Sequence, residues 1–146
     1  MIVPLGDGLT ATAAANSHFD HDGKPDPSNI SFSYRFALGD RSITYTGDTG
    51  PSDAVTRLAS GTDMLVSEVI DLDPILASIR KTRPDMPEAL FQSMSKHLST
   101  HHITPVDLGG LDVQELHVEI VCRRMRQLRR VGHIIVAHSK RAFGCF

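Results

Sequence analysis

Three side chains of the kinds that bind metal ions follow stretches expected to be strands. His18 comes after an alternating run of small apolar residues and threonines, and Asp48 comes after the run at 42–46. His138 closes the apolar run at 134–138. Neutral imidazole and carboxylate groups are ligands for first-row metals, and a strand tip holds a ligand on a rigid support. Each residue alone is a weak indication, because a histidine at a strand end is more often hydrogen-bonded than bound to a metal.

The turn around Asp48 joins an expected strand to an expected helix. Residues 42–46 alternate β-branched or aromatic side chains with polar ones, which predicts a strand. The glycines and proline of 47–51 allow a sharp turn, and Ser52 or Asp53 then supplies a helix N-cap. Asp48 would thus lie at the carboxyl end of a strand, where open α/β sheets bind ligands. The alternative is that Asp48 only closes the turn through an Asx hydrogen bond.

The remaining pattern predicts an α/β fold with a mixed sheet and helices on one face. The clearest strand is 30–36, with its large apolar side chains on one face, and it should form a hairpin with 43–46. Further strands are expected at 9–15, 64–70 and 134–138, and helices from 54 to about 61, at 74–80 and at 87–96. Residues 97–105 predict a polar loop with three histidines, in which Thr104 caps a helix that begins at Pro105.

Composition predicts a globular domain in a reducing compartment. The chain has 146 residues, of which 40% are hydrophobic, and a net charge of −2, values typical of a folded, soluble protein. No apolar run reaches the ~18 residues that a membrane span requires, so no membrane partner is expected. Cys122 and Cys145 fit neither a disulfide framework nor a Cys-x-x-Cys site. Free thiols indicate a cytoplasmic location.

The last part of the chain, 112–146, is basic, with seven Lys or Arg against three Asp or Glu and a net charge of +4. Apolar residues at a rough helical period predict one helix over 113–128 with a basic C-terminal half. Five arginines fall between Arg123 and Arg130, and a nucleic-acid contact is one interpretation of them. A solvated helix face is the commoner explanation, because no aromatic residues are interleaved with these arginines.

Five blocks of the sequence resemble the metallo-β-lactamase-fold hydrolases, and most closely the branch with the tRNA 3′-processing endonucleases and arylsulfatase-like enzymes. In chain order the blocks are 15–19 (ANSHF), 33–36 (SYRF), 46–49 (TGDT), 58–68 (LASGTDMLVSE) and 102–105 (HITP). The resemblance implies one half of an αββα sandwich. It also implies a zinc-dependent hydrolase that cleaves an ester, lactone or phosphodiester bond in a small-molecule or phosphodiester substrate.

The resemblance also implies a role for each residue of the site. His18 and His138 would be metal ligands, and Asp48 would bridge the metals where a complete domain holds two zinc ions rather than one. His102 would be the histidine beside the leaving group, off the metal, with Glu68 as its neighbour at the end of the adjacent strand. His102 would then donate a proton to the departing oxygen.

The His-x-His-x-Asp-His element of this family is missing from the sequence. We therefore expect residues 1–111 to be the C-terminal half of such a domain, and 112–146 to be its divergent helix and final strand. The 35 residues between His102 and His138 exceed the family's spacing. Little or no activity is expected from the chain alone. The alternative is a non-catalytic interaction module or inactive fragment, whose apolar sheet face requires a separate N-terminal half or a second copy of the chain.

Overall fold

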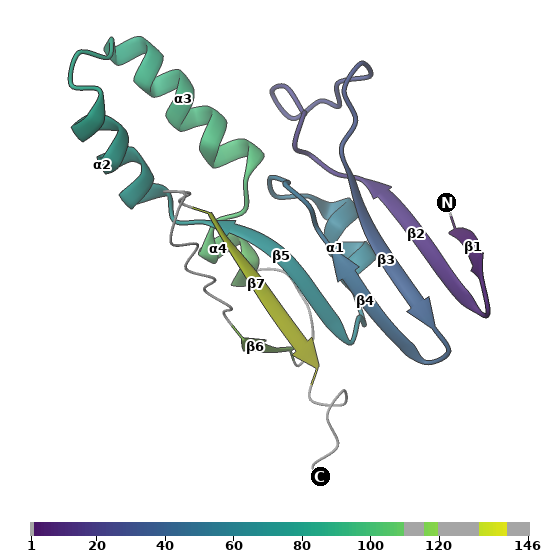
Figure 1. Ribbon diagram of the computed structural model, residues 1–146. Coiled ribbons are helices and arrows are strands. Elements are labelled where there is room, and N and C mark those ends of the chain that lie inside the picture. Colours follow the sequence, from purple (N-terminus) through teal and green to yellow (C-terminus); the bar gives the residue numbers. More distant parts are fainter. Residues whose placement is uncertain (1, 110–115, 120–131, 140–146) are drawn as a thin grey trace.

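The computed structural model describes residues 2–109, 116–119 and 132–139. In these residues seven strands form one sheet in the order β1-β2-β3-β4-β5-β7-β6 (Figure 1). The strands are β1 (Ile2–Gly6), β2 (Leu9–Ala15), β3 (Phe32–Leu38), β4 (Arg41–Tyr45), β5 (Met64–Ile70), β6 (Leu116–Glu119) and β7 (Gly132–Ser139). The helices are α1 (Asp53–Ala59), α2 (Leu72–Thr82), α3 (Glu88–His101) and α4 (Pro105–Gly109). The fold class is α/β, as predicted.

The sheet is mixed, since β4 and β5 run parallel while the other neighbouring strands run antiparallel. The expected strands at 9–15, 30–36, 43–46, 64–70 and 134–138 all belong to it, although β3 begins at Phe32. The β3–β4 hairpin turns at Gly39, whose φ of 59° suits glycine. Between parallel β4 and β5 lies the crossover that contains the Asp48 turn and α1. This connection places the turn at the carboxyl ends of both strands.

One face of the sheet is covered by α1. Of the two predicted N-cap candidates, Ser52 caps this helix, its Oγ accepting from the Val55 N–H at 3.4 Å. Val55 and Leu58 are buried beneath the helix. The Arg35 guanidinium of β3 donates to the carbonyl oxygens at the end of α1 and just after it, at 3.3 Å to Leu58, 2.7 Å to Ser60 and 3.2 Å to Gly61. This clamp anchors the end of the helix to the strand beneath it.

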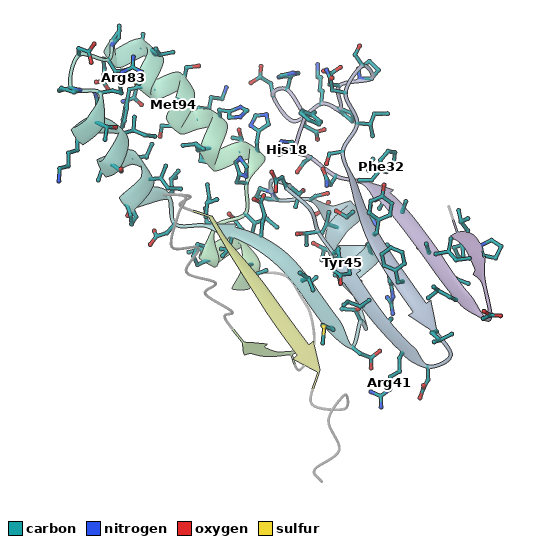
Figure 2. The ribbon with its side chains drawn as sticks, in the orientation of Figure 1. His18, Phe32, Arg41, Tyr45, Arg83 and Met94 are labelled. Carbon is teal, nitrogen blue, oxygen red and sulfur yellow. The ribbon has the colours of Figure 1, made fainter. Side chains whose placement is uncertain are left out.

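The opposite face of the sheet exposes aromatic side chains. Phe32 and Tyr34 are each 43% exposed, and Tyr45 is 42% exposed. Tyr34 pairs with Tyr45 across β3 and β4, so these side chains share one face. In Figure 2 the rings of Phe32 and Tyr45 stand in front of the sheet, away from α1. We call this surface, formed by Phe32, Tyr34, Phe36 and Tyr45, the aromatic face.

The α2–α3 pair extends beyond the end of β5 (Figure 1). The prediction of a polar loop at 97–105 was wrong in its first half, because α3 continues to His101. Its polar residues are compatible with a helix, since Ser99 and Thr100 donate their hydroxyls to the Lys96 carbonyl at 3.0 and 2.8 Å. Helix α4 begins at Pro105, as predicted. The Thr104 hydroxyl, just before it, accepts from the Asp107 N–H at 3.3 Å, which confirms the predicted cap.

The single helix predicted over 113–128 was wrong for residues 116–119, which form β6. This strand pairs antiparallel with β7, Val118 lying opposite Ala137. Pairing with a strand already in the sheet overrides a rough helical periodicity. The remainder of that expected helix, including Arg123 to Arg130, lies outside the described residues, as do Cys122 and Cys145. None of the helices within the described ranges has the length and apolar character needed to cross a membrane.

Candidate metal centre

Three side chains from distant parts of the chain meet at the end of the sheet where β4 and β5 finish. His18 follows β2, Asp48 follows β4, and His102 follows α3. One ligand atom from each lies within 4.8 Å of the other two. Among the residues that the structure describes, this is the one group of three or more His, Cys, Asp or Glu side chains with such spacing. Asp48 is exposed, and the two histidines are partly buried.

Asn16 fixes the backbone conformation at His18 through its side-chain hydrogen bonds. It is buried at the end of β2, where its Nδ2 donates to the Thr46 carbonyl and the Ser33 hydroxyl, both at 3.2 Å. Its Oδ1 accepts from the His18 N–H at 3.1 Å. Asn16 therefore ties the end of β2 to the end of β4, which are the strands that lead to His18 and Asp48. Sequence reasoning gave Asn16 no role, although it lies in the ANSHF block.

The His18 ring is oriented by the end of α3. Its Nδ1 lies 3.0 Å from the His101 carbonyl oxygen. A carbonyl oxygen only accepts hydrogen bonds, so Nδ1 carries the proton and Nε2 of the neutral ring keeps its lone pair. Metal-binding histidines commonly donate their second ring N–H to such an acceptor. His18 is thus held in a tautomer that can bind a metal through Nε2.

His102 is held by Glu68. The His102 Nδ1 lies 3.1 and 3.0 Å from the two carboxylate oxygens of Glu68, and the side chains are 17% and 15% exposed. The hydrogen bond to Glu68 raises the pKa of His102 above its ordinary value, against the opposite effect of burial. The charges of Glu68 and Asp48 act in the same direction as the hydrogen bond. The arrangement favours an imidazolium whose Nε2–H is free to donate.

The Asp48 turn is joined to the same network. The Thr49 N–H donates to Glu68 Oε1 at 2.8 Å, so one carboxylate binds both the turn and His102. At the next position, a Cβ on Gly50 would lie only 1.9 Å from the Thr100 carbonyl oxygen. Only glycine allows this approach of the turn to the last residues of α3. Gly50 therefore determines how close Asp48 comes to the two histidines.

The residues present fit a zinc ion. His18 offers an uncommitted imidazole nitrogen and Asp48 offers an exposed carboxylate, which are ligands that zinc takes in proteins. The His102 ring lies beside them, with its centroid 5.3 Å from that of His18. His101, the neighbour of His102, directs its ring toward His97 instead, at a centroid distance of 4.1 Å.

The structure does not bring His138 to this group. β7 runs antiparallel to β5, and its register pairs His138 with Met64, at the start of β5. Asp48 lies at the other end of the sheet, beside Glu68. Four residues of strand span ~13 Å, which is too far for a shared ion. The side chain of His138 lies outside the description, but its backbone position alone removes the expected convergence.

Neither comparison with protein-family models nor comparison with curated protein sequences gives a match.

Proposed function

We propose that this chain carries part of a metal-dependent hydrolase centre of the metallo-β-lactamase kind, which acts on ester, lactone or phosphodiester bonds. The observation that supports the proposal is the convergence of His18, Asp48 and the His102–Glu68 pair at one end of the sheet. These residues come from four of the blocks on which the resemblance rests. Residues that merely cap turns or fill a core have no physical reason to meet there.

In this proposal His18 and Asp48 hold the metal. His18 presents Nε2 because its Nδ1–H is bound by the His101 carbonyl. Asp48 is placed by the Gly47–Pro51 turn, and its carboxylate is exposed. A bound zinc ion would lower the pKa of its water to about 7 and polarise the bond to be cleaved.

In this proposal His102 donates a proton and does not bind the metal. The resemblance gives His102 this role, and Glu68 favours the protonated form of its ring by raising its pKa. An imidazolium next to a metal site is suited to protonate a departing oxygen. Glu68 positions the ring by binding Nδ1 with both oxygens, and this leaves Nε2–H directed at the substrate.

The metal ligands that this chain provides form an incomplete site. Two ligands hold zinc less firmly than the three that a catalytic site ordinarily provides. In the proposal a His-x-His-x-Asp-His half supplies the others and covers the aromatic face, completing the αββα sandwich. We therefore expect zinc binding from the chain alone but little hydrolysis.

Zinc titration by calorimetry tests the ligand assignment. Asp48→Ala should weaken zinc binding, whereas Asp40→Ala, which removes an exposed aspartate from the β3–β4 turn, should leave it unchanged. His102→Ala should keep the zinc affinity and lower any turnover measured with a complementing half. Equal affinity in the parent and in Asp48→Ala would refute the ligand assignment. Loss of zinc from His102→Ala would make His102 a ligand and refute the proton-donor assignment.

An interaction module is the second candidate, and the aromatic face favours it. Phe32, Tyr34 and Tyr45 are each more than 40% exposed on one flat surface, the kind of patch that sheet-on-sheet packing buries. In this candidate function, the binding partner is a second copy of the chain. Tyr34→Lys should then convert a dimer to a monomer in sedimentation velocity, while Leu90→Lys, on an exposed leucine of α3, should not. A monomeric parent protein would reject this candidate.

A further inference from the structure

A second group of histidines lies beside the candidate metal centre, and the rings of these histidines take no part in it. His97 and His101 are one helical turn apart on α3, and their rings stack with centroids 4.1 Å apart. His21, in the loop between β2 and β3, faces them with its centroid 6.4 Å from that of His101. In Figure 1 the last turn of α3 lies beside this loop.

The three histidines line one cavity of about 510 Å³. The loop side of the cavity contributes Asp20 and Asp22 as well as His21, and the helix side contributes Lys96 as well as His97 and His101. Lys96 is paired with Asp22 at 2.9 Å, so the lysine that lines the cavity has a carboxylate partner. The cavity is open to solvent and has room for the water molecules that complete a metal ion's coordination.

The His101 ring is held in a metal-binding tautomer. Its Nδ1 lies 2.9 Å from the His97 carbonyl oxygen, a group that can only accept. The Thr100 hydroxyl, whose own proton is directed to the Lys96 carbonyl at 2.8 Å, is the second acceptor at Nδ1, also at 2.8 Å. Nδ1 therefore carries the proton, and Nε2 keeps its lone pair.

We propose that His97 and His101, with His21 as a third ligand from the facing loop, form a separate binding site for a first-row transition-metal ion. Two histidines at positions i and i+4 of a helix present their rings on one side and are a known way to hold zinc. The rings are stacked rather than spread around an ion. Binding therefore requires side-chain rotation in His97 and an approach of about 1 Å or more by the exposed His21.

The pKa of His97 in this site and the pKa of His102 beside Glu68 are shifted in opposite directions. Desolvation lowers the pKa of His97, and the nearby imidazoles of His101, His102, His18 and His21 lower it further. The lowered pKa favours the neutral form of His97, which is the form that a metal binds. His102 has the opposite tendency, because Glu68 favours its protonated form. Imidazole ligands without thiolates suit Zn²⁺, Ni²⁺ or Cu²⁺.

Ni²⁺ titration of the full chain by calorimetry tests the site, with Asp48→Ala as the background so that the first centre is weakened. In this background the pair His97→Gln and His101→Gln should weaken Ni²⁺ binding by at least about tenfold, since loss of groups that merely orient a ligand already costs ~10–100-fold. His21→Gln should weaken it less. His117→Gln is the matched control, because β6 places this histidine opposite His138, at the other end of the sheet from both sites, and it should have no effect.

The outcome does not depend on the proposed hydrolase function, because the first centre is weakened in the same way in every sample. Undiminished Ni²⁺ affinity in the His97→Gln, His101→Gln pair would overturn the proposal. Equal weakening by His18→Gln would also overturn it, since the ion would then occupy the first centre. Circular dichroism of each variant checks that the substitutions leave the fold intact.

Discussion

Gly50→Ala is the substitution that most directly tests how the candidate centre is assembled. The added Cβ would lie 1.9 Å from the Thr100 carbonyl oxygen and 2.9 Å from the Thr100 carbonyl carbon. Both atoms are backbone, so no side chain can rotate away. Restoring an ordinary contact of 3.4 Å requires the turn and the end of α3 to separate by about 1.5 Å. Because His101 and His102 follow Thr100 directly, they move with it.

This separation is large compared with the tolerances of the site. Metal–ligand distances are held within ~0.2 Å, and hydrogen bonds weaken beyond ~3.2 Å. A shift of 1.5 Å breaks the bond between the His18 Nδ1 and the His101 carbonyl, which measures 3.0 Å. Loss of a group that orients a metal ligand costs ~10–100-fold in affinity. We therefore expect zinc binding to weaken by about that factor in Gly50→Ala.

The fold should survive this substitution. Overpacking of a well-packed site costs ~1–3 kcal/mol, against ~5–15 kcal/mol of total stability for an ordinary domain. Zinc calorimetry, with thermal unfolding of the metal-free protein, separates the two effects. Gly109→Ala is the matched control, because a Cβ there meets nothing within 4 Å. A folded Gly50→Ala protein that binds zinc as the parent does would refute the reasoning.

Three further predictions concern the elements that support the centre. Arg35→Met should lower the free energy of unfolding by ~1–3 kcal/mol in urea titration, because it removes the charged clamp on α1; Arg57→Met, on the exposed side of α1, should change it little. Ser52→Ala should cost ~1 kcal/mol by the same measurement, through loss of the N-cap. The pKa of His102 in the folded protein is raised above 6.5, mainly by Glu68. The His102–Glu68 pair therefore stabilises the fold fully below the pKa that His102 has in the unfolded chain, and this stabilisation is lost as pH rises through the pKa of His102 in the folded protein. The difference in melting temperature between the parent and Glu68→Gln should therefore shrink from about pH 6 to pH 9, and a constant difference would contradict this.

Local patterns in the sequence were sufficient for much of the sheet and for the Asp48 turn. Alternation of β-branched and aromatic residues marked β3 and β4, and Gly39 marked the hairpin between them. The glycines of 47–51, followed by Ser52, marked the end of a strand and the start of a helix. These features depend on backbone sterics and on hydrogen bonds between residues close in sequence. That is why they can be recognised without the rest of the fold.

Other features depended on which segments lie side by side in the folded chain. Residues 97–101 contain enough polar side chains to suggest a loop, but bonds to preceding carbonyls and continuity with α3 make them helical. Residues 116–119 have a rough helical period and become β6 by pairing with β7. The sequence also allowed His138 to end a strand at the site. Strand direction alone places it at the opposite end of the sheet.

The candidate centre shows the same division. The sequence placed His18 and Asp48 after expected strands, Glu68 near the end of another and His102 in an expected loop, and resemblance suggested their roles. Tertiary structure decided that Glu68 binds both Thr49 and His102. It also decided which nitrogen of each histidine is free, because the acceptors at Nδ1 come from residues up to 83 positions away. A side chain's type is a property of the chain, whereas its partner, and hence its protonation and orientation, is a property of the fold.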